Sequence, residues 1–413
     1  MTPVPPPPPP LRRRQGPRPL GLHLAASLSV LLSCPAGLPF LRSGSLPWRP
    51  ELRERATALQ PHLAAVGADA LARAVDREMR HRLDRLLTGI ERYRRHPYHR
   101  DLEDPPTVWA EGPARLLDFG GWGAPALFVP SLVNRGYILD LSRHRSLLRW
   151  LAGNGVRPLL LDWGRPGAAE RSFDLTEVIA GRLTRALDAA RRHLDGRRPA
   201  LVGYCMGGLL AAAAAGRRPE DVAALVALAT PWDFHADDPA GAGRTAALLP
   251  AFEPALVTLG ELPVDAIQTL FLMLDPLLGL KKFSRFADLP EGSEEADDFV
   301  ALEDWLNDGV PLPAPVAREC LGGWYGRNDP GRGRWQVAGA PVEPGRLALP
   351  ALVVVPARDR IVPPASAAAL AAAIPGAERW DPPLGHIGMV VSGGAEAKLW
   401  RPLRDWLVRT VPA

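Results

Sequence analysis

The sequence predicts an α/β fold, in which a mostly parallel sheet carries helices. From Thr107 onward, short β-prone apolar runs alternate with helical segments, a rhythm typical of right-handed βαβ units. One of these runs, residues 200–204, ends in a glycine-rich turn that leads at once into an alanine-rich helical segment. These observations predict one α/β domain over residues 105–413, behind a helical N-terminal region.

The bulk composition is that of an ordinary globular protein. The chain has 413 residues, of which 47% are hydrophobic and 23% charged, with a formal net charge of +4. This mild positive charge suits an anionic substrate and does not favour nucleic acid. The three cysteines (positions 34, 205 and 320) have no paired spacing, so we expect neither a disulfide framework nor a zinc site. A reducing, cytoplasmic location fits them.

The N-terminal region divides by composition. Residues 1–19 are rich in proline and arginine, which predicts a disordered lead. The apolar stretch 20–32 follows the arginines at 12–14, so a signal peptide is one interpretation. We favour a helix that packs on the domain or on a partner, because the stretch contains histidine and serine and is short for a membrane span. Helical spacing of apolar residues continues over about 50–100, so residues 20–104 are predicted to be helical.

Apolar runs predict strands, and longer amphipathic runs predict helices. The strands are expected at 126–129, 158–163, 200–204, 224–228 and 351–355, with helices through 147–151 and 176–194. Between about 231 and 349 the rhythm breaks, which predicts a cap inserted into the core. Caps of this kind cover an apolar site and exclude water; a plain structural insertion is the alternative.

Cys205 is the most informative residue. It lies in Gly203-Tyr204-Cys205-Met206-Gly207-Gly208, the strand, sharp turn and helix of a nucleophile elbow, with cysteine in the usual place of serine. Side chains at Gly203 or Gly207 are expected to collide with the neighbouring helix or strand. The elbow predicts the α/β-hydrolase fold, and its thiol indicates acyl transfer through a thioester.

Two candidate partners follow in the order of nucleophile, acid and base that this fold uses. Asp359 lies in the loop after the strand at 351–355, and His386 lies in a glycine-flanked loop as the only histidine beyond residue 235. Asp381 is an alternative acid. We favour Asp359, because Asp381 is too near the base in sequence.

The chemistry assigns the roles. His386 is expected to take the Cys205 proton, and the N-terminus of the following helix to stabilise the thiolate. Asp359 fixes the imidazole tautomer and stabilises the imidazolium. The backbone N–H of Met206 is one expected oxyanion donor, and that of Val133, in the loop after the strand at 126–129, is the second.

These residues together resemble the polyhydroxyalkanoate synthase family. The resemblance covers roughly residues 105–400 and includes the 203–208 box, the segments 161–164, 305–308 and 385–388, and the run 130–141, which looks like the family's P-P-x-x-N-x-x-Y-I-L-D-L. It implies an α/β-hydrolase core with a cap and a triad of Cys205, His386 and Asp359. The matched motifs make Asn134, Tyr137 and Trp305 candidates for substrate binding.

The resemblance also implies a reaction. The family polymerises (R)-3-hydroxyacyl-CoA, releasing CoA while the growing oxoester chain is held on the cysteine, and its aspartate is thought to help activate the incoming 3-hydroxyl. No metal or redox cofactor is implied, because CoA enters as part of the substrate. The implied partners are a polyester granule and either a second synthase subunit or a homodimer, with no nucleic acid.

Two other functions compete. A thioesterase or an intracellular polyester depolymerase could use the same fold, since the outcome depends on whether water reaches the acyl-enzyme. A non-catalytic, granule-associated protein is the third interpretation, supported by the helical region and opposed by the intact triad.

Overall fold

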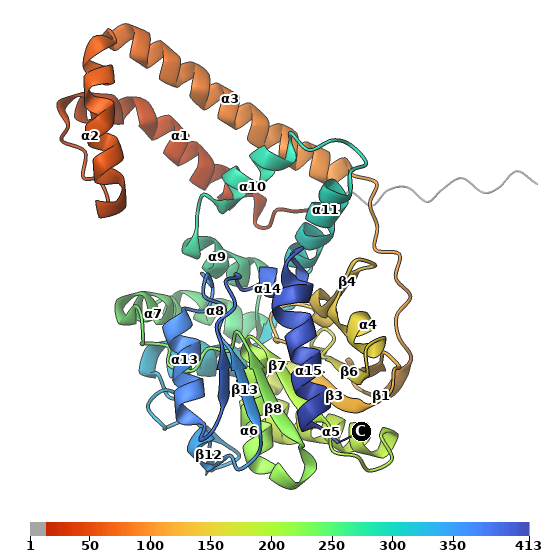
Figure 1. The fold of residues 1–413 in the computed structure, drawn as a ribbon. Helices are drawn as coiled ribbons and strands as arrows, with labels where there is room; N and C mark the ends of the chain where they lie inside the picture. Colours follow the sequence, from red (N-terminus) through yellow and green to blue (C-terminus); the bar gives the residue numbers. More distant parts are fainter. Residues whose placement is uncertain (1–13, 413) are drawn as a thin grey trace, which may run out of the picture. The chain divides into compact units, whose positions relative to one another are not determined.

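The computed structural model describes residues 14–412 and divides into two compact units (Figure 1). One unit comprises the chain up to His99 together with Asp275–Asn307, and the other comprises Arg100–Leu274 and Asp308–Ala413. The region from 231 to 349, expected as one cap, therefore contributes to both units.

The larger unit is built on an eight-stranded sheet of order β1-β2-β6-β3-β7-β8-β13-β14. The six strands from β6 to β14 in this order are parallel, and β2 pairs antiparallel with both β1 and β6. The strands are β1 Thr107–Glu111, β2 Ala114–Asp118, β3 Ala124–Val129, β6 Val156–Asp162, β7 Ala200–Tyr204, β8 Ala224–Leu228, β13 Ala351–Val354 and β14 Glu378–Trp380. The mostly parallel α/β-hydrolase sheet predicted from the sequence is confirmed.

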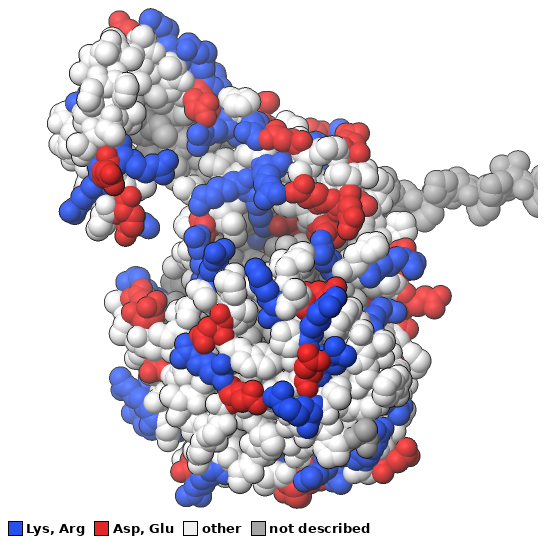
Figure 2. Space-filling model, viewed as in Figure 1, with Lys and Arg blue, Asp and Glu red and all other residues white. Residues whose placement is uncertain are grey.

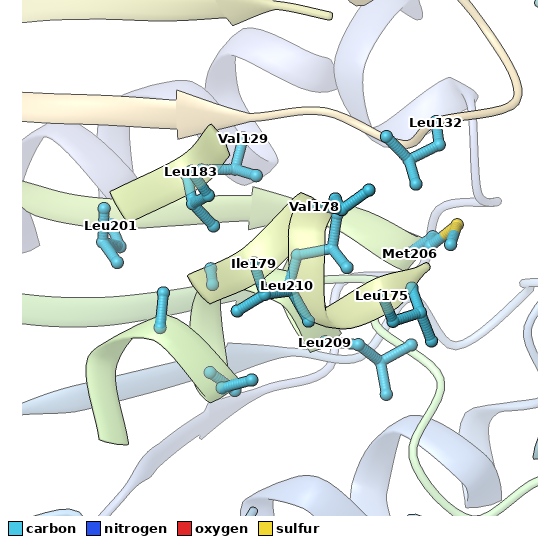
Figure 3. Packing of buried hydrophobic residues seen from close by; sticks show 14 of the residues in the cluster. Val129, Leu132, Leu175, Val178, Ile179, Leu183, Leu201, Met206, Leu209 and Leu210 are labelled. Atoms are coloured by element: carbon cyan, nitrogen blue, oxygen red, sulfur yellow. The ribbon is translucent and has the colours of Figure 1, made fainter. Parts of the chain in front are cut away.

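The core strands are apolar along their whole length because the sheet is covered on both faces. Every residue of β3, β7, β8 and β13 is buried. On one face, side chains of β3 and β7 pack against the π-helix η3 (Glu177–Leu183) and α6 (Met206–Arg217), as Figure 3 shows for Val129, Leu201, Ile179 and Leu210. The same cluster includes α5 (Thr184–His193). Helices α4 (Leu147–Ala152) and α15 (Arg401–Thr410) contact β6, and α13 (Pro364–Ala373) contacts β13.

Between β8 and β13 the larger unit carries several short helices. They are α7 Pro239–Ala246, α8 Leu249–Leu259, α9 Val264–Leu274, α12 Ala314–Arg318 and the π-helix η5 Glu319–Arg327. The remaining short elements include η1 (Gly136–Leu139), α14 (Gly388–Val391) and the two-residue or three-residue strands β4 Asp140–Ser142, β5 Arg145–Ser146, β9 Glu261–Leu262, β10 Leu312–Pro313, β11 Gln336–Val337 and β12 Ala340–Pro341.

The smaller unit is helical. It contains α1 Leu20–Ser43, α2 Pro50–Ala65, α3 Ala68–Arg95, α10 Leu278–Phe286 and α11 Glu294–Asn307. Its core joins residues far apart in sequence, with Leu86, Ile90 and Tyr93 of α3 against Phe283 and Phe286 of α10. The close fit of the two helices depends on Gly89, because a Cβ there would lie 1.9 Å from the Phe283 carbonyl oxygen.

Two features of this unit differ from expectation. Residues 1–13 of the predicted disordered lead lie outside the described residues, whereas Arg14 pairs with Asp304 at 2.6 Å and the Arg18 amide donates to Asn307 Oδ1 at 2.8 Å. The apolar stretch seen at 20–32 is part of a longer helix, since α1 continues through Pro35 and Pro39 to Ser43. With 24 residues it is long and apolar enough to cross a membrane, so the length argument against a span was wrong.

Candidate active site

Cys205 occupies a sharp turn between β7 and α6. Its φ of 56° and ψ of −127° lie outside the regions that ordinary side chains favour, so the backbone is strained at this residue. The turn is held by its amide, which donates to the Leu228 carbonyl at 2.8 Å. Cys205 is the N-cap of α6, so its sulfur lies at the positive end of the helix dipole.

The glycines around Cys205 allow the turn to pack closely. A Cβ at Gly203 would lie 2.3 Å from Gly208 Cα, and a Cβ at Gly207 would lie 2.0 Å from the Val129 carbonyl oxygen. Both distances are far below van der Waals contact with backbone atoms that cannot swing away. The elbow therefore lies directly against the end of β3, which leads into the loop of Leu132 and Val133.

His386 and Asp359 form a buried pair. His386 Nδ1 lies 2.7 Å from Asp359 Oδ2, and only 7% and 1% of the two side chains are exposed. The other carboxylate oxygen, Asp359 Oδ1, accepts the amides of Ile361 and Val362 at 2.8 and 2.9 Å. The rival acid Asp381 is half exposed and pairs with Arg379 at 2.6 Å. The structure thus brings Asp359 to His386.

The two loops that carry this pair are joined by backbone hydrogen bonds. The amides of Ala357 and Arg358, after β13, donate to the carbonyls of Pro382 and Leu384 at 2.9 Å each. The His386 carbonyl in turn accepts the Tyr204 hydroxyl at 3.1 Å. Since Tyr204 directly precedes Cys205, this bond ties the histidine loop to the elbow.

His386 also lies within the electrostatic reach of Cys205. Burial favours the neutral imidazole and would lower its pKa, but the negative charge of Cys205 and the hydrogen bond to Asp359 outweigh it and raise the pKa of His386 to about 10. The arrangement therefore favours the imidazolium form of His386.

The two expected oxyanion donors lie in different surroundings. Met206 is the first residue of α6, where backbone N–H groups have no partner within the helix. The Val133 amide lies 3.4 Å from the Ser131 hydroxyl oxygen, a long hydrogen bond, and the Val133 carbonyl accepts the Val310 amide at 3.0 Å. Val133 is therefore held through its carbonyl, while its amide makes only a long hydrogen bond.

The candidate substrate residues belong to two different units. Asn134 has a buried side-chain nitrogen, Nδ2, with no hydrogen-bond partner, one residue after Val133. Tyr137 lies on η1 beneath the Arg100 guanidinium, 5.6 Å from the ring centroid. Trp305 is buried in α11, which belongs to the helical unit.

A cavity of about 280 Å³ lies next to Tyr137. Its lining includes the apolar residues Leu117, Phe119 and Leu160 together with charged groups of both signs. Asp140, also at this cavity, is 1% exposed and accepts hydrogen bonds from Ser146, Arg149 and Arg100 at 2.6 to 2.7 Å. Asp140 thus ties the end of η1 to the start of α4 and to the segment of Arg100, and the triad residues do not line this cavity.

Sequence reasoning did not find Tyr325 of η5. Its ring packs on Phe234 with centroids 4.9 Å apart, and its carbonyl hydrogen-bonds with His235 Nε2 at 2.8 Å. Burial raises the pKa of Tyr325, and the charge of Cys205 raises it further, so the phenol lies in the electrostatic reach of the thiol. The adjacent pair Trp324-Tyr325 inside an otherwise irregular region was the available signal.

Comparison with known proteins agrees with the fold. The family model for the alpha/beta hydrolase fold matches residues 127–392. The fold and the site therefore define this chain as a member of the α/β-hydrolase superfamily.

Among curated proteins, the chain is similar to the poly(3-hydroxyalkanoate) polymerase subunit PhaC of Synechocystis, with 30% identity over 68% of this chain and 77% of that protein. PhaC of Haloferax mediterranei is 28% identical over 72% of this chain. The chain spans 62% of the length of that relative. Among solved structures, an esterase from Thermogutta terrifontis is 17% identical, covers 75% of this chain and 100% of its own, and has a TM-score of 0.46. The chain belongs to the PhaC family of poly(3-hydroxyalkanoate) polymerase subunits, a family of acyltransferase-type enzymes.

Proposed function

We propose that the protein polymerises (R)-3-hydroxyacyl-CoA into polyester through Cys205, with His386 as base and Asp359 as its orienting acid. The observation that carries the proposal is the buried His386–Asp359 pair, 2.7 Å between Nδ1 and Oδ2, at a cysteine elbow. The PhaC relatives support the polymerising outcome.

In the first step, His386 takes the Cys205 proton and the thiolate attacks the thioester carbonyl carbon of the substrate. The Met206 and Val133 amides stabilise the oxyanion of the tetrahedral intermediate. The bond between that carbon and the CoA sulfur then breaks, and the imidazolium returns its proton to the leaving thiolate. The products of this step are free CoA and an acyl group on Cys205.

In the second step, a 3-hydroxyl oxygen attacks the acyl thioester and an oxoester forms. His386 is the better base for this hydroxyl, because both oxygens of Asp359 already accept hydrogen bonds and its side chain is 1% exposed. The carboxylate therefore acts through the imidazole, by stabilising its charged form. The Cys205 thiolate leaves and accepts the next acyl unit.

The substrate and its partners follow from this chemistry. The substrate supplies CoA, so no resident cofactor takes part. Asn134 is proposed to contact the acyl substrate through its unpaired Nδ2, with Tyr137 and Trp305 as further substrate-binding residues. The protein is proposed to act in the cytoplasm at the surface of its polyester granule, either as a homodimer or with a second synthase subunit.

The test is a product assay on the purified chain with (R)-3-hydroxybutyryl-CoA. Polymerisation predicts CoA release together with insoluble polyester. Release of free hydroxy acid alone would mean that the protein is a thioesterase and not a synthase. If CoA is not released, longer acyl chains and a synthase partner subunit are added, and continued inactivity with all of them overturns the proposal.

A further inference from the structure

Helix α1 is apolar on every side. Residues 20–41 contain no aspartate, glutamate, lysine or arginine. Its most apolar 18-residue window has a mean hydropathy of 1.8, and only 11% of that window is buried. A helix that is apolar all round is normally enclosed by protein or by lipid.

The helical unit encloses only one stripe of α1. Leu20, Leu24 and Leu31 pack with α3 and α10. On the rest of the helix, the side chains of Leu32 and Phe40 are 70% and 57% exposed, and Leu22 and Val30 are about two-fifths exposed. Such a continuous apolar surface is unusual on a soluble protein and marks an interaction site.

Arginines flank this surface at both ends. Arg18 precedes α1, and Arg42 lies in its last turn. The partner helix α3 carries eight arginines against five acidic residues. Figure 2 shows basic side chains along the exposed side of α3. An apolar strip flanked by arginines is complementary to a layer that is apolar inside and anionic at its surface.

We infer that α1 inserts into the surface of a phospholipid layer with anionic headgroups. Because one stripe of α1 stays on the charged helix α3, α1 lies in the plane of the layer and does not cross it. The exposed leucines and Phe40 enter the acyl region, and the flanking arginines contact the headgroups. This inference is independent of the proposed reaction.

The structure supplies its own reporter. Cys34 is exposed on α1, and Cys320 is buried. In a Cys205→Ala background, an environment-sensitive fluorophore can therefore be attached at Cys34 of the full chain. The probes are vesicles of phosphatidylcholine, with and without phosphatidylglycerol. We expect co-flotation and a blue shift of the fluorophore with the anionic vesicles.

The test variant is Leu32→Arg with Phe40→Arg, and the matched control is Leu52→Arg with Leu59→Arg on α2, whose side chains are about two-fifths exposed. All four positions are exposed, so the fold should persist, as circular dichroism would verify. We expect at least a tenfold loss of vesicle partition for the α1 variant and less than a twofold change for the control.

Four outcomes would overturn the inference. The folded chain could remain unbound with anionic vesicles, or both variants could lose binding equally. In a third outcome, sedimentation without vesicles shows a dimer that the α1 variant dissociates, so a second copy of the chain covers the surface. In a fourth, the chain binds amorphous polyester particles and not lipid, so polyester covers it. The assay of CoA release is a separate readout, so failure of this inference leaves the proposed reaction untouched.

Discussion

Asp359 meets His386 across 27 residues of sequence with both of its carboxylate oxygens in use. One oxygen accepts the ring, and the other accepts two amides of its own loop. This carboxylate has one orientation, so the imidazole it holds has one orientation too. The relationship makes the Asp359 loop the part of the site that sets the position of the base.

Replacing Asp359 by Asn is expected to lower the rate of CoA release at least about 100-fold, because an amide no longer stabilises the imidazolium and favours the wrong tautomer. The matched control is Asp381→Asn, which removes an exposed pair with Arg379 and should change the rate less than twofold. Steady-state kinetics of both variants measure this. Equal losses of rate in the two variants would mean that Asp359 is not the acid of the site.

Cys205→Ala is expected to abolish CoA release, and Cys205→Ser to lower it at least about 1,000-fold, because an alcohol is far less ionised than a thiol. Cys34→Ser changes an exposed cysteine outside the site and should keep full activity. Mass spectrometry should find a covalent acyl group on the native chain and none on Cys205→Ala. A fully active serine variant would contradict the thiolate mechanism.

The charge of Cys205 is the largest influence that raises the pKa of His386 to about 10. In Cys205→Ala that pKa should fall, which NMR titration of the imidazole can follow. Because the folded-state pKa is raised, the contribution of His386 to stability is complete below its ordinary pKa of about 6.5 and is lost as the pH rises through about 10. The difference in unfolding free energy between the native chain and His386→Gln should therefore shrink from pH 7 to pH 10, and a constant difference would refute the raised value.

Gly207→Ala is expected to destabilise the fold by more than about 2 kcal/mol, because its Cβ would meet the Val129 carbonyl at 2.0 Å and the two backbones would have to separate. Gly243 lies in α7 with open space around it, so Gly243→Ala should be neutral or slightly stabilising. Denaturant unfolding compares the two. If they behave alike, close packing does not explain the glycine.

The central sheet and the elbow could be predicted from the sequence. The central strands are short apolar runs, and the candidate nucleophile lies in a motif whose glycines are required by close backbone packing. The antiparallel pairing of β2 with β6 was not predictable, since strand direction depends on partners distant in sequence. Residues 20–104 were predicted to be helical, but the apolar stretch was limited to 20–32, whereas α1 continues through Pro35 and Pro39 to Ser43, although proline usually disfavours a helix interior.

The site was predicted in the same uneven way. Cys205, Asp359 and His386 each follow a recognisable strand or glycine turn, so their convergence could be expected from the order of elements. Tyr325 lies on the π-helix η5, and no periodicity in the sequence indicates that helix. Trp305, chosen from a matched segment, lies in the other unit.

The helical unit is formed by two segments that are far apart in the sequence. For example, Arg92 on α3 donates a hydrogen bond to the carbonyl of Phe286, 194 residues later. On the ribosome, at about 5–20 residues per second, α3 emerges on the order of 10–40 seconds before α10 exists. Throughout that interval α1 and the apolar face of α3 lack the helix that covers them, so the nascent chain needs a chaperone or a lipid surface as a temporary substitute. Chains stalled before Leu278 should therefore crosslink to chaperones through the apolar face of α3, and chains stalled well after Asn307 should do so less, because α10 then covers that face.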